Sequence, residues 1–154
     1  MAVAYIALGS NLGDRAGFLK SAVEKIAKLP KTQVIRRSSW HETPPAGGPP
    51  QGLFLNGVAK VETALKPVDL LDRLQQIEQD LGRPRDREKW GPRVVDLDLL
   101  DYGGLGMKSA GLELPHPRLH ERPFVLVPLV EIEPEWFHPR LKKTAKELLE
   151  EIPL

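Results

Sequence analysis

Two aspartates one residue apart, Asp96 and Asp98, are the side chains best suited to chemistry in this sequence. In an extended strand alternate side chains share a face, so the two carboxylates would lie side by side. The residues that alternate with them, Val95, Leu97 and Leu99, would point into a core. Mg²⁺ typically takes one or two protein carboxylates and completes its coordination with water and substrate phosphate oxygens. The pair therefore predicts a divalent metal site, although an isolated Asp-x-Asp motif more often marks only the solvent-facing side of a strand.

A cluster of basic side chains precedes the aspartate pair. Its five cations outnumber its two carboxylates by three, in a chain whose formal net charge is only +1. The cations are Arg83, Arg85, Arg87, Lys89 and Arg93, and the carboxylates are Asp86 and Glu88. Guanidinium groups match phosphate oxygens in bidentate geometry, so this cluster beside a metal site predicts polyphosphate binding, with ATP as the ligand. Pro84, Gly91 and Pro92 predict an irregular loop that closes over the ligand.

Composition limits the classes of protein that fit. The chain has 154 residues, a length suited to one domain, and we expect a single domain over residues 1–154. Its 22 Lys and Arg nearly balance its 21 Asp and Glu, so no long-range field favours nucleic acid or membranes. The absence of cysteine excludes disulfides and thiolate chemistry, and it agrees with a cytoplasmic location. We expect small-molecule substrates, no nucleic-acid or membrane partner, and no obligate protein partner.

The first half of the chain alternates strands and helices. Its patterns predict strands over residues 3–8, 33–41 and 53–65, helices over residues 14–29 and 67–81, and a Pro- and Gly-rich connector over residues 43–52. The strand over 33–41 places four side chains on one face: Val34, Arg36, Ser38 and Trp40. Phe54 and Asn56 would project together, which suits a flat heterocycle as well as it suits an exposed strand edge. Gln75 and Glu78 lie beside the apolar stripe of their helix, a pattern that fits plain surface residues as well as residues lining a cleft next to the basic loop.

The second half predicts less regular structure. After the aspartate strand we expect a short strand over residues 112–114, a helix or core segment over 125–132 and a terminal helix over 144–152. His116 and His120 have the spacing of a helical zinc pair. The prolines around them argue against a helix and no third ligand is evident, so zinc is not predicted.

The order of these elements predicts the fold class. Strand, helix, strand, strand, helix, strand is the βαββαβ pattern of an α+β ferredoxin-like sandwich. Two helices would cover one face of an antiparallel sheet, and the other face would be partly open beneath long active-site loops. We expect four side chains to face that opening: Asp96, Asp98, Phe54 and Asn56.

Longer motifs resemble one enzyme family. The segment Trp90-Gly91-Pro92-Arg93-x-x-Asp96-Leu97-Asp98, with Gly82-Arg83-x-Arg85 ahead of it, resembles the signature of 6-hydroxymethyl-7,8-dihydropterin pyrophosphokinases. The similarity extends from Tyr5–Gly13 through Thr43-Pro44-Pro45 to Pro115-His116 and Arg122-Pro123-Phe124. It implies transfer of the terminal diphosphate of ATP to the hydroxymethyl group of a reduced pterin, with release of AMP, in folate biosynthesis. It also implies two Mg²⁺ ions and an in-line displacement at the β phosphorus.

The resemblance assigns roles residue by residue. Asp96 and Asp98 resemble the metal ligands, and Arg83 and Arg93 resemble residues that assist the chemistry. The nucleotide contacts would be Gln75, Glu78, Arg85, Trp90, Arg93, Leu99, His116 and Arg122. The pterin pocket would comprise Thr43, Pro44, Pro45, Ala46, Phe54, Asn56 and Phe124.

The chain departs from familiar members at five positions. Phe54 replaces a tyrosine, Ala46 a leucine and Lys89 an arginine, and Gly111 and Glu113 stand at positions that contact adenine. Two rival interpretations remain at this stage. An RNA-binding module shares the order of elements but requires an aromatic strand motif that is missing here. A folded relative without catalytic activity is the other.

Overall fold

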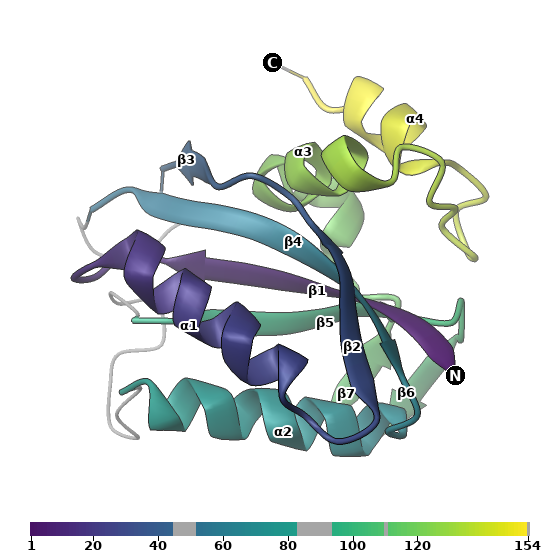
Figure 1. Cartoon of the computed structure of the whole chain (residues 1–154). Helices are drawn as coiled ribbons and strands as arrows, with labels where there is room; N and C mark the ends of the chain where they lie inside the picture. Colours follow the sequence, from purple (N-terminus) through teal and green to yellow (C-terminus); the bar gives the residue numbers. More distant parts are fainter. Residues whose placement is uncertain (45–51, 83–93, 110, 154) are drawn as a thin grey trace.

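A five-stranded antiparallel sheet forms the centre of the protein (Figure 1). The computed structural model describes residues 1–44, 52–82, 94–109 and 111–153. The strand order is β2-β4-β1-β5, and the short β3 also pairs with β4. The strands are β1 (Ala2–Ser10), β2 (Thr32–Arg37), β3 (His41–Thr43), β4 (Phe54–Thr63) and β5 (Asp96–Tyr102). A separate two-stranded sheet pairs β6 (Met107–Ser109) with β7 (Leu112–Leu114).

Two helices cover one face of the sheet, α1 (Arg15–Ala27) and α2 (Pro67–Asp80); Figure 1 shows α1 in front of the strands and α2 along the bottom. α1 begins where the sequence predicts, because the Asp14 carboxylate accepts a hydrogen bond from the Gly17 N–H at 3.1 Å. α2 begins at Pro67, and Gly82 follows it with a φ of 108°, a conformation that favours glycine. The core between helices and sheet includes Ile6, Leu8, Leu19, Ile26, Ala59, Val61, Leu70 and Leu74.

The opposite face carries a second core beneath α3 (Pro123–Ile132) and α4 (Ala145–Glu150). Figure 1 shows both helices above the sheet, on the side away from α1 and α2. A short 3₁₀ helix, η1 (Leu119–Glu121), precedes α3. The predicted α+β sandwich is confirmed, but this face is less open than expected. Because α3 is apolar on nearly every side, it packs against both the sheet and α4.

The predicted strand over residues 33–41 is wrong in its second half. β2 ends at Arg37, and its pairing with β4 shifts between Val34 and Arg36, which indicates a β-bulge. Val34 packs with the core beneath α1 and α2, whereas Arg36 donates a hydrogen bond to the Ile132 carbonyl of α3 on the other face. The extra residue therefore breaks the alternation that placed both on one face.

No helix within the described ranges combines the length and apolarity needed to span a bilayer.

Candidate active site

Strand pairing aligns three residues in a row across the sheet. Gly9 on β1 pairs with Asn56 on β4 and with Asp96 on β5. Residues directly opposite each other in antiparallel strands point to the same face, so Asn56 and Asp96 share a face, roughly 10 Å apart across two strand spacings. Asp98 projects from that face two residues further along β5, opposite Ala7. The row brings the candidate metal ligands beside a candidate pterin contact.

The alternation predicted for the aspartate strand is confirmed. Val95, Leu97 and Leu99 are at most 4% exposed and belong to the core beneath α1 and α2. Asp96 and Asp98 are half-buried at the surface between them. In the described part of the chain, no group of three or more His, Asp or Glu side chains is arranged to hold a metal. Two carboxylates that leave positions for water and phosphate oxygens suit Mg²⁺.

Glu78 on α2 supports the aspartate strand from below. Its side chain is buried, with only 4% of the residue exposed, and Oε2 accepts a hydrogen bond from the Leu97 N–H at 2.7 Å. Leu97 lies between the two aspartates on β5, which ends the strand order, so no strand among the described residues lies beside this N–H to accept its hydrogen. Glu78 therefore anchors the backbone from which Asp96 and Asp98 project.

A cleft of about 610 Å³ runs beside β5, between α2 and the β6–β7 hairpin. The apolar part of its wall comes from Pro117 and from four leucines on three elements: Leu71, Leu97, Leu99 and Leu112. Its polar lining brings together five predicted site residues: Gln75, Glu78, Asp96, Asp98 and His116. Leu71 and Leu112 were missed, because an apolar residue in a cleft has the same sequence pattern as one in a core. The lining suits a ligand with an apolar flat part and a charged part.

Arg122 and Phe124 enter the site from the start of α3. Arg122 Nη1 lies 3.8 Å from Asp98 Oδ2, and its guanidinium lies 5.5 Å from the centre of the Phe124 ring. The side chain of Asp98 is 40% exposed and that of Arg122 is 20% exposed. Because solvent screens this ion pair, it contributes little to the stability of the fold, and its main effect is to orient the Arg122 and Asp98 side chains.

His116 presents a neutral ring to the cleft. Burial, and after it the Arg122 guanidinium, lowers the pKa of His116 to about 4 despite the opposing Glu113 carboxylate. Nδ1 accepts a hydrogen bond from the Arg118 N–H at 3.2 Å. In a neutral imidazole the other nitrogen then carries the hydrogen, so Nε2 is available as a donor.

The candidate pterin contacts meet at the other end of the row. Thr43 on β3 pairs with Phe54 on β4, and the Asn56 amide donates a hydrogen bond to the Thr43 hydroxyl. A Cβ atom at Gly9 would lie 2.8 Å from Asn56 Oδ1 and 3.5 Å from the Phe54 ring. Gly9 thus leaves room for the amide and ring to project together. Pro44, another predicted pterin contact, lies within the described residues and is exposed.

Several predicted site residues lie outside the described ranges. They are Pro45 and Ala46 of the pterin set and Arg83, Arg85, Trp90 and Arg93 of the nucleotide and catalytic sets, together with Lys89. The two departures expected near adenine, Gly111 and Glu113, do line the cleft. Arg140 Nη1 lies 3.7 Å from the Glu113 carboxylate.

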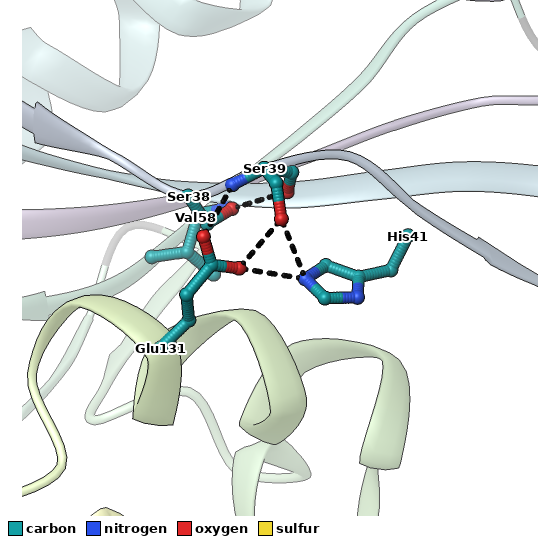
Figure 2. Close-up of polar contacts among 5 residues, drawn as sticks. All are labelled: Ser38, Ser39, His41, Val58 and Glu131. Atoms are coloured by element: carbon teal, nitrogen blue, oxygen red, sulfur yellow. Dashed lines mark hydrogen bonds and ion pairs between the residues drawn. The ribbon is translucent and has the colours of Figure 1, made fainter.

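Two side chains that the sequence did not single out hold the two ends of β3: Arg15 at the end that leads to β4, and Glu131 at the start. Arg15 donates a hydrogen bond to the Leu53 carbonyl at 2.9 Å and pairs with Glu42 at 2.8 Å. Glu131 contacts Ser39 and His41 from α3 (Figure 2). These partners lie between 27 and 92 residues away in the chain, so no local pattern indicated them.

Sequence comparison finds relatives along most of the chain. Residues 5–134 match the family model for 7,8-dihydro-6-hydroxymethylpterin-pyrophosphokinase (HPPK). The 2-amino-4-hydroxy-6-hydroxymethyldihydropteridine pyrophosphokinase of Synechocystis sp. is 44% identical over 149 residues, which cover 97% of this chain and 75% of that protein. The protein of the same name from Bacillus subtilis is 46% identical over 130 residues, or 84% and 77% of the two chains.

Solved structures with the same fold are longer. An HPPK-DHPS in complex with substrates aligns with a TM-score of 0.73 and 13% identity over 97% of this chain. The Plasmodium falciparum HPPK-DHPS with pteroate aligns with a TM-score of 0.75 and 16% identity, also over 97% of this chain. The chain spans 43% and 42% of those two chains, less than half of each.

The sequence relatives define the class as pyrophosphokinases, which are transferases, and the structural neighbours share the fold. Within that class the match to residues 5–134 identifies the family. The chain belongs to the 7,8-dihydro-6-hydroxymethylpterin-pyrophosphokinase family. The resemblance carried by the Trp90–Asp98 signature is therefore confirmed.

Proposed function

We propose that the chain transfers the diphosphate of ATP to the hydroxymethyl group of 6-hydroxymethyl-7,8-dihydropterin, giving AMP and the pterin diphosphate, as a step of folate biosynthesis. One observation carries the proposal. The carboxylates of Asp96 and Asp98 lie at the rim of a cleft suited to a nucleotide, on the sheet face that also presents Asn56. A metal-binding pair between two substrate sites is what transfer between those substrates requires.

The nucleotide would occupy the cleft beside β5. Leucine side chains offer apolar contacts to the base, and Gln75 offers hydrogen bonds from α2. Toward the aspartates, the Nε2 hydrogen of neutral His116 and the guanidinium of Arg122 suit phosphate oxygens. Glu78 contributes to the wall of the cleft, but one of its carboxylate oxygens is engaged by Leu97. From the resemblance, Arg85, Trp90 and Arg93 would add contacts to the same ligand.

The pterin would bind at the other end of the row. The rings of Phe54 and Phe124 suit the faces of a flat bicycle, and the Asn56 amide and the Thr43 hydroxyl suit its hydrogen-bonding edge. Phenylalanine in place of the family's tyrosine keeps an aromatic ring and removes only a hydroxyl. Stacking therefore survives this departure.

Two Mg²⁺ ions are the proposed metals, and Asp96 and Asp98 would hold them. The fit rests on the two half-buried carboxylates that share one face at the cleft. When bound, the metal would neutralise triphosphate charge and fix the orientation of the phosphates.

The protein's part in the reaction is positioning and charge neutralisation. The pterin hydroxyl oxygen forms a bond to the β phosphorus, the bond from that phosphorus to the oxygen bridging the α phosphate breaks, AMP leaves with that oxygen, and the hydroxyl proton is released. No covalent enzyme intermediate is needed. Arg122, and from the resemblance Arg83 and Arg93, would offset the negative charge of the phosphates, while substrates held in line lower the entropic part of the barrier.

The test compares two substitutions of aspartate by asparagine. In Asp98→Asn we expect AMP release from ATP, Mg²⁺ and the reduced pterin alcohol to fall at least a hundredfold, on the order of one lost electrostatic contact in a transition state. Asp72→Asn, an exposed position on α2, is the control and should match wild type. Near-normal turnover in a folded Asp98→Asn protein would refute the metal assignment.

A further inference from the structure

Glu131 ties the segment before β3 to the last turn of α3 (Figure 2). Its Oε2 accepts a hydrogen bond from the Ser39 N–H at 2.8 Å. Its Oε1 accepts one from the Ser39 hydroxyl at 2.8 Å and contacts His41 Nε2 at 2.7 Å. Figure 2 shows the carboxylate reaching from the helix to both residues. We call Glu131, Ser39 and His41 the Glu131 clamp.

The clamp favours a charged carboxylate. Burial by itself raises the pKa of Glu131, but the hydrogen bonds from the Ser39 N–H, from His41 and from the Ser39 hydroxyl outweigh it and hold the pKa below its usual range. Hydrogen bonds to a charged acceptor are stronger than neutral ones. The clamp therefore holds the strand more firmly than a neutral amide in the same place would.

The clamped strand carries part of the proposed pterin pocket. Within β3, His41 pairs with Asn56 and Thr43 pairs with Phe54. The Asn56 amide then bonds the Thr43 hydroxyl across the strands. β3 has only three residues, so its pairing with β4 alone holds it weakly. The contact of Glu131 with His41 at one end of β3 therefore affects the position of Thr43 at the other end.

α3 also carries the opposite side of that pocket. Phe124 lies in its first turn and Glu131 in its last. They lie seven positions apart along the helix, a span of about 10 Å. One helix thus sets the position of the Phe124 ring relative to the strand that bears Thr43.

We propose that Glu131 is a positioning residue for the pterin substrate, which acts through Ser39 and His41 to hold β3 against β4. This inference rests on the proposed function and adds a residue that touches neither substrate. It makes the placement of Thr43 depend on a helix more than 80 residues away in the chain.

Glu133 supplies a matched control on the same stretch of chain. It follows α3 directly, and its carboxylate contacts Lys60 Nζ at 2.6 Å and the Tyr5 hydroxyl at 3.4 Å. Tyr5 lies on β1, and Lys60 lies on β4 outside the stretch Phe54–Asn56 that pairs with β3. Glu133→Gln therefore weakens the attachment of this segment to the sheet without touching the clamp.

The experiment measures steady-state kinetics of AMP formation in wild type, Glu131→Gln and Glu133→Gln, with each substrate varied in turn. For Glu131→Gln we expect the KM for the pterin alcohol to rise about fivefold to tenfold, the effect of roughly one hydrogen bond, with kcat and the KM for ATP within twofold of wild type. Glu133→Gln should keep the wild-type KM for both substrates. Ser39→Ala, which retains the backbone donor, should raise the pterin KM by a smaller factor.

The outcomes separate this inference from the proposed function. Failure of the wild-type protein to form AMP overturns the proposed function and the inference with it. With an active wild type, an unchanged pterin KM in Glu131→Gln overturns the inference alone. Equal rises in the pterin KM for Glu131→Gln and Glu133→Gln, or an equal rise in the KM for ATP, overturn it too, because they show a general loosening of α3. If Glu131→Gln does not fold, Ser39→Ala decides by the same criteria.

Discussion

Replacing Glu78 with alanine tests whether a buried carboxylate holds the strand that carries the aspartates. The substitution removes the acceptor of the Leu97 N–H, a 2.7 Å bond in a site where only 4% of Glu78 is exposed. A hydrogen bond to a charged group contributes about 1.5–3 kcal/mol, and a buried donor left without a partner costs a similar amount. We expect the free energy of unfolding to fall by about 2–3 kcal/mol.

The size of the chain converts that loss into a melting temperature. For proteins of about 150 residues each kcal/mol shifts Tm by about 2–4 °C, so Glu78→Ala should melt about 4–12 °C below wild type. Urea unfolding measures the free energy directly. Glu78→Gln keeps an acceptor oxygen and should lose less than half as much. A second readout is nucleotide binding in the presence of Mg²⁺, which should weaken if the backbone between Asp96 and Asp98 moves.

Gln75→Ala is the control, since Gln75 is exposed one turn earlier on α2 and lines the same cleft. An exposed substitution of this kind changes stability by no more than about 0.5 kcal/mol. If Glu78→Ala were as stable as Gln75→Ala, the bond to Leu97 would contribute nothing and the anchoring role of Glu78 would be wrong.

Three further predictions use other parts of the structure. Gly9→Ala should weaken pterin binding and leave Tm nearly unchanged, because the new Cβ would lie 2.8 Å from Asn56 Oδ1 and only that side chain must move; an unchanged pterin Kd would contradict this. Burial, then Arg140, lowers the pKa of His138 to about 4 from the ordinary 6.5. Between pH 6.5 and 4 the unfolded chain therefore binds a proton at His138 that the folded protein does not bind, so the free energy of unfolding falls as the pH drops over that range. In His138→Asn the fall of Tm over the same range should be shallower. Thr144→Ala removes the capping box of α4 and should cost about 1 kcal/mol without changing turnover; an equal loss of activity would mean that α4 supports the site.

The sequence predicted best where side-chain periodicity decides the structure. The alternation around Asp96 and Asp98, the cap at Asp14 and the start of α2 at Pro67 follow from local rules, and the structure confirms each. The signature over residues 90–98 identified the family because it combines many residues at fixed spacing.

Long-range contacts were beyond prediction from one sequence. Glu78 looked like a surface residue beside an apolar stripe, and its burial depends on an edge strand 19 residues later. The Glu131 clamp joins residues that lie about 90 positions apart. The bulge in β2 adds a residue that no alternating pattern contains, so it reverses the face of Arg36.

The ratio of AMP to ADP formed from ATP, Mg²⁺ and the reduced pterin alcohol tests the central claim most directly. Transfer of a diphosphate from the cleft beside β5 predicts one AMP for each pterin product and no ADP. Formation of ADP, or release of AMP without a phosphorylated pterin, would contradict the account.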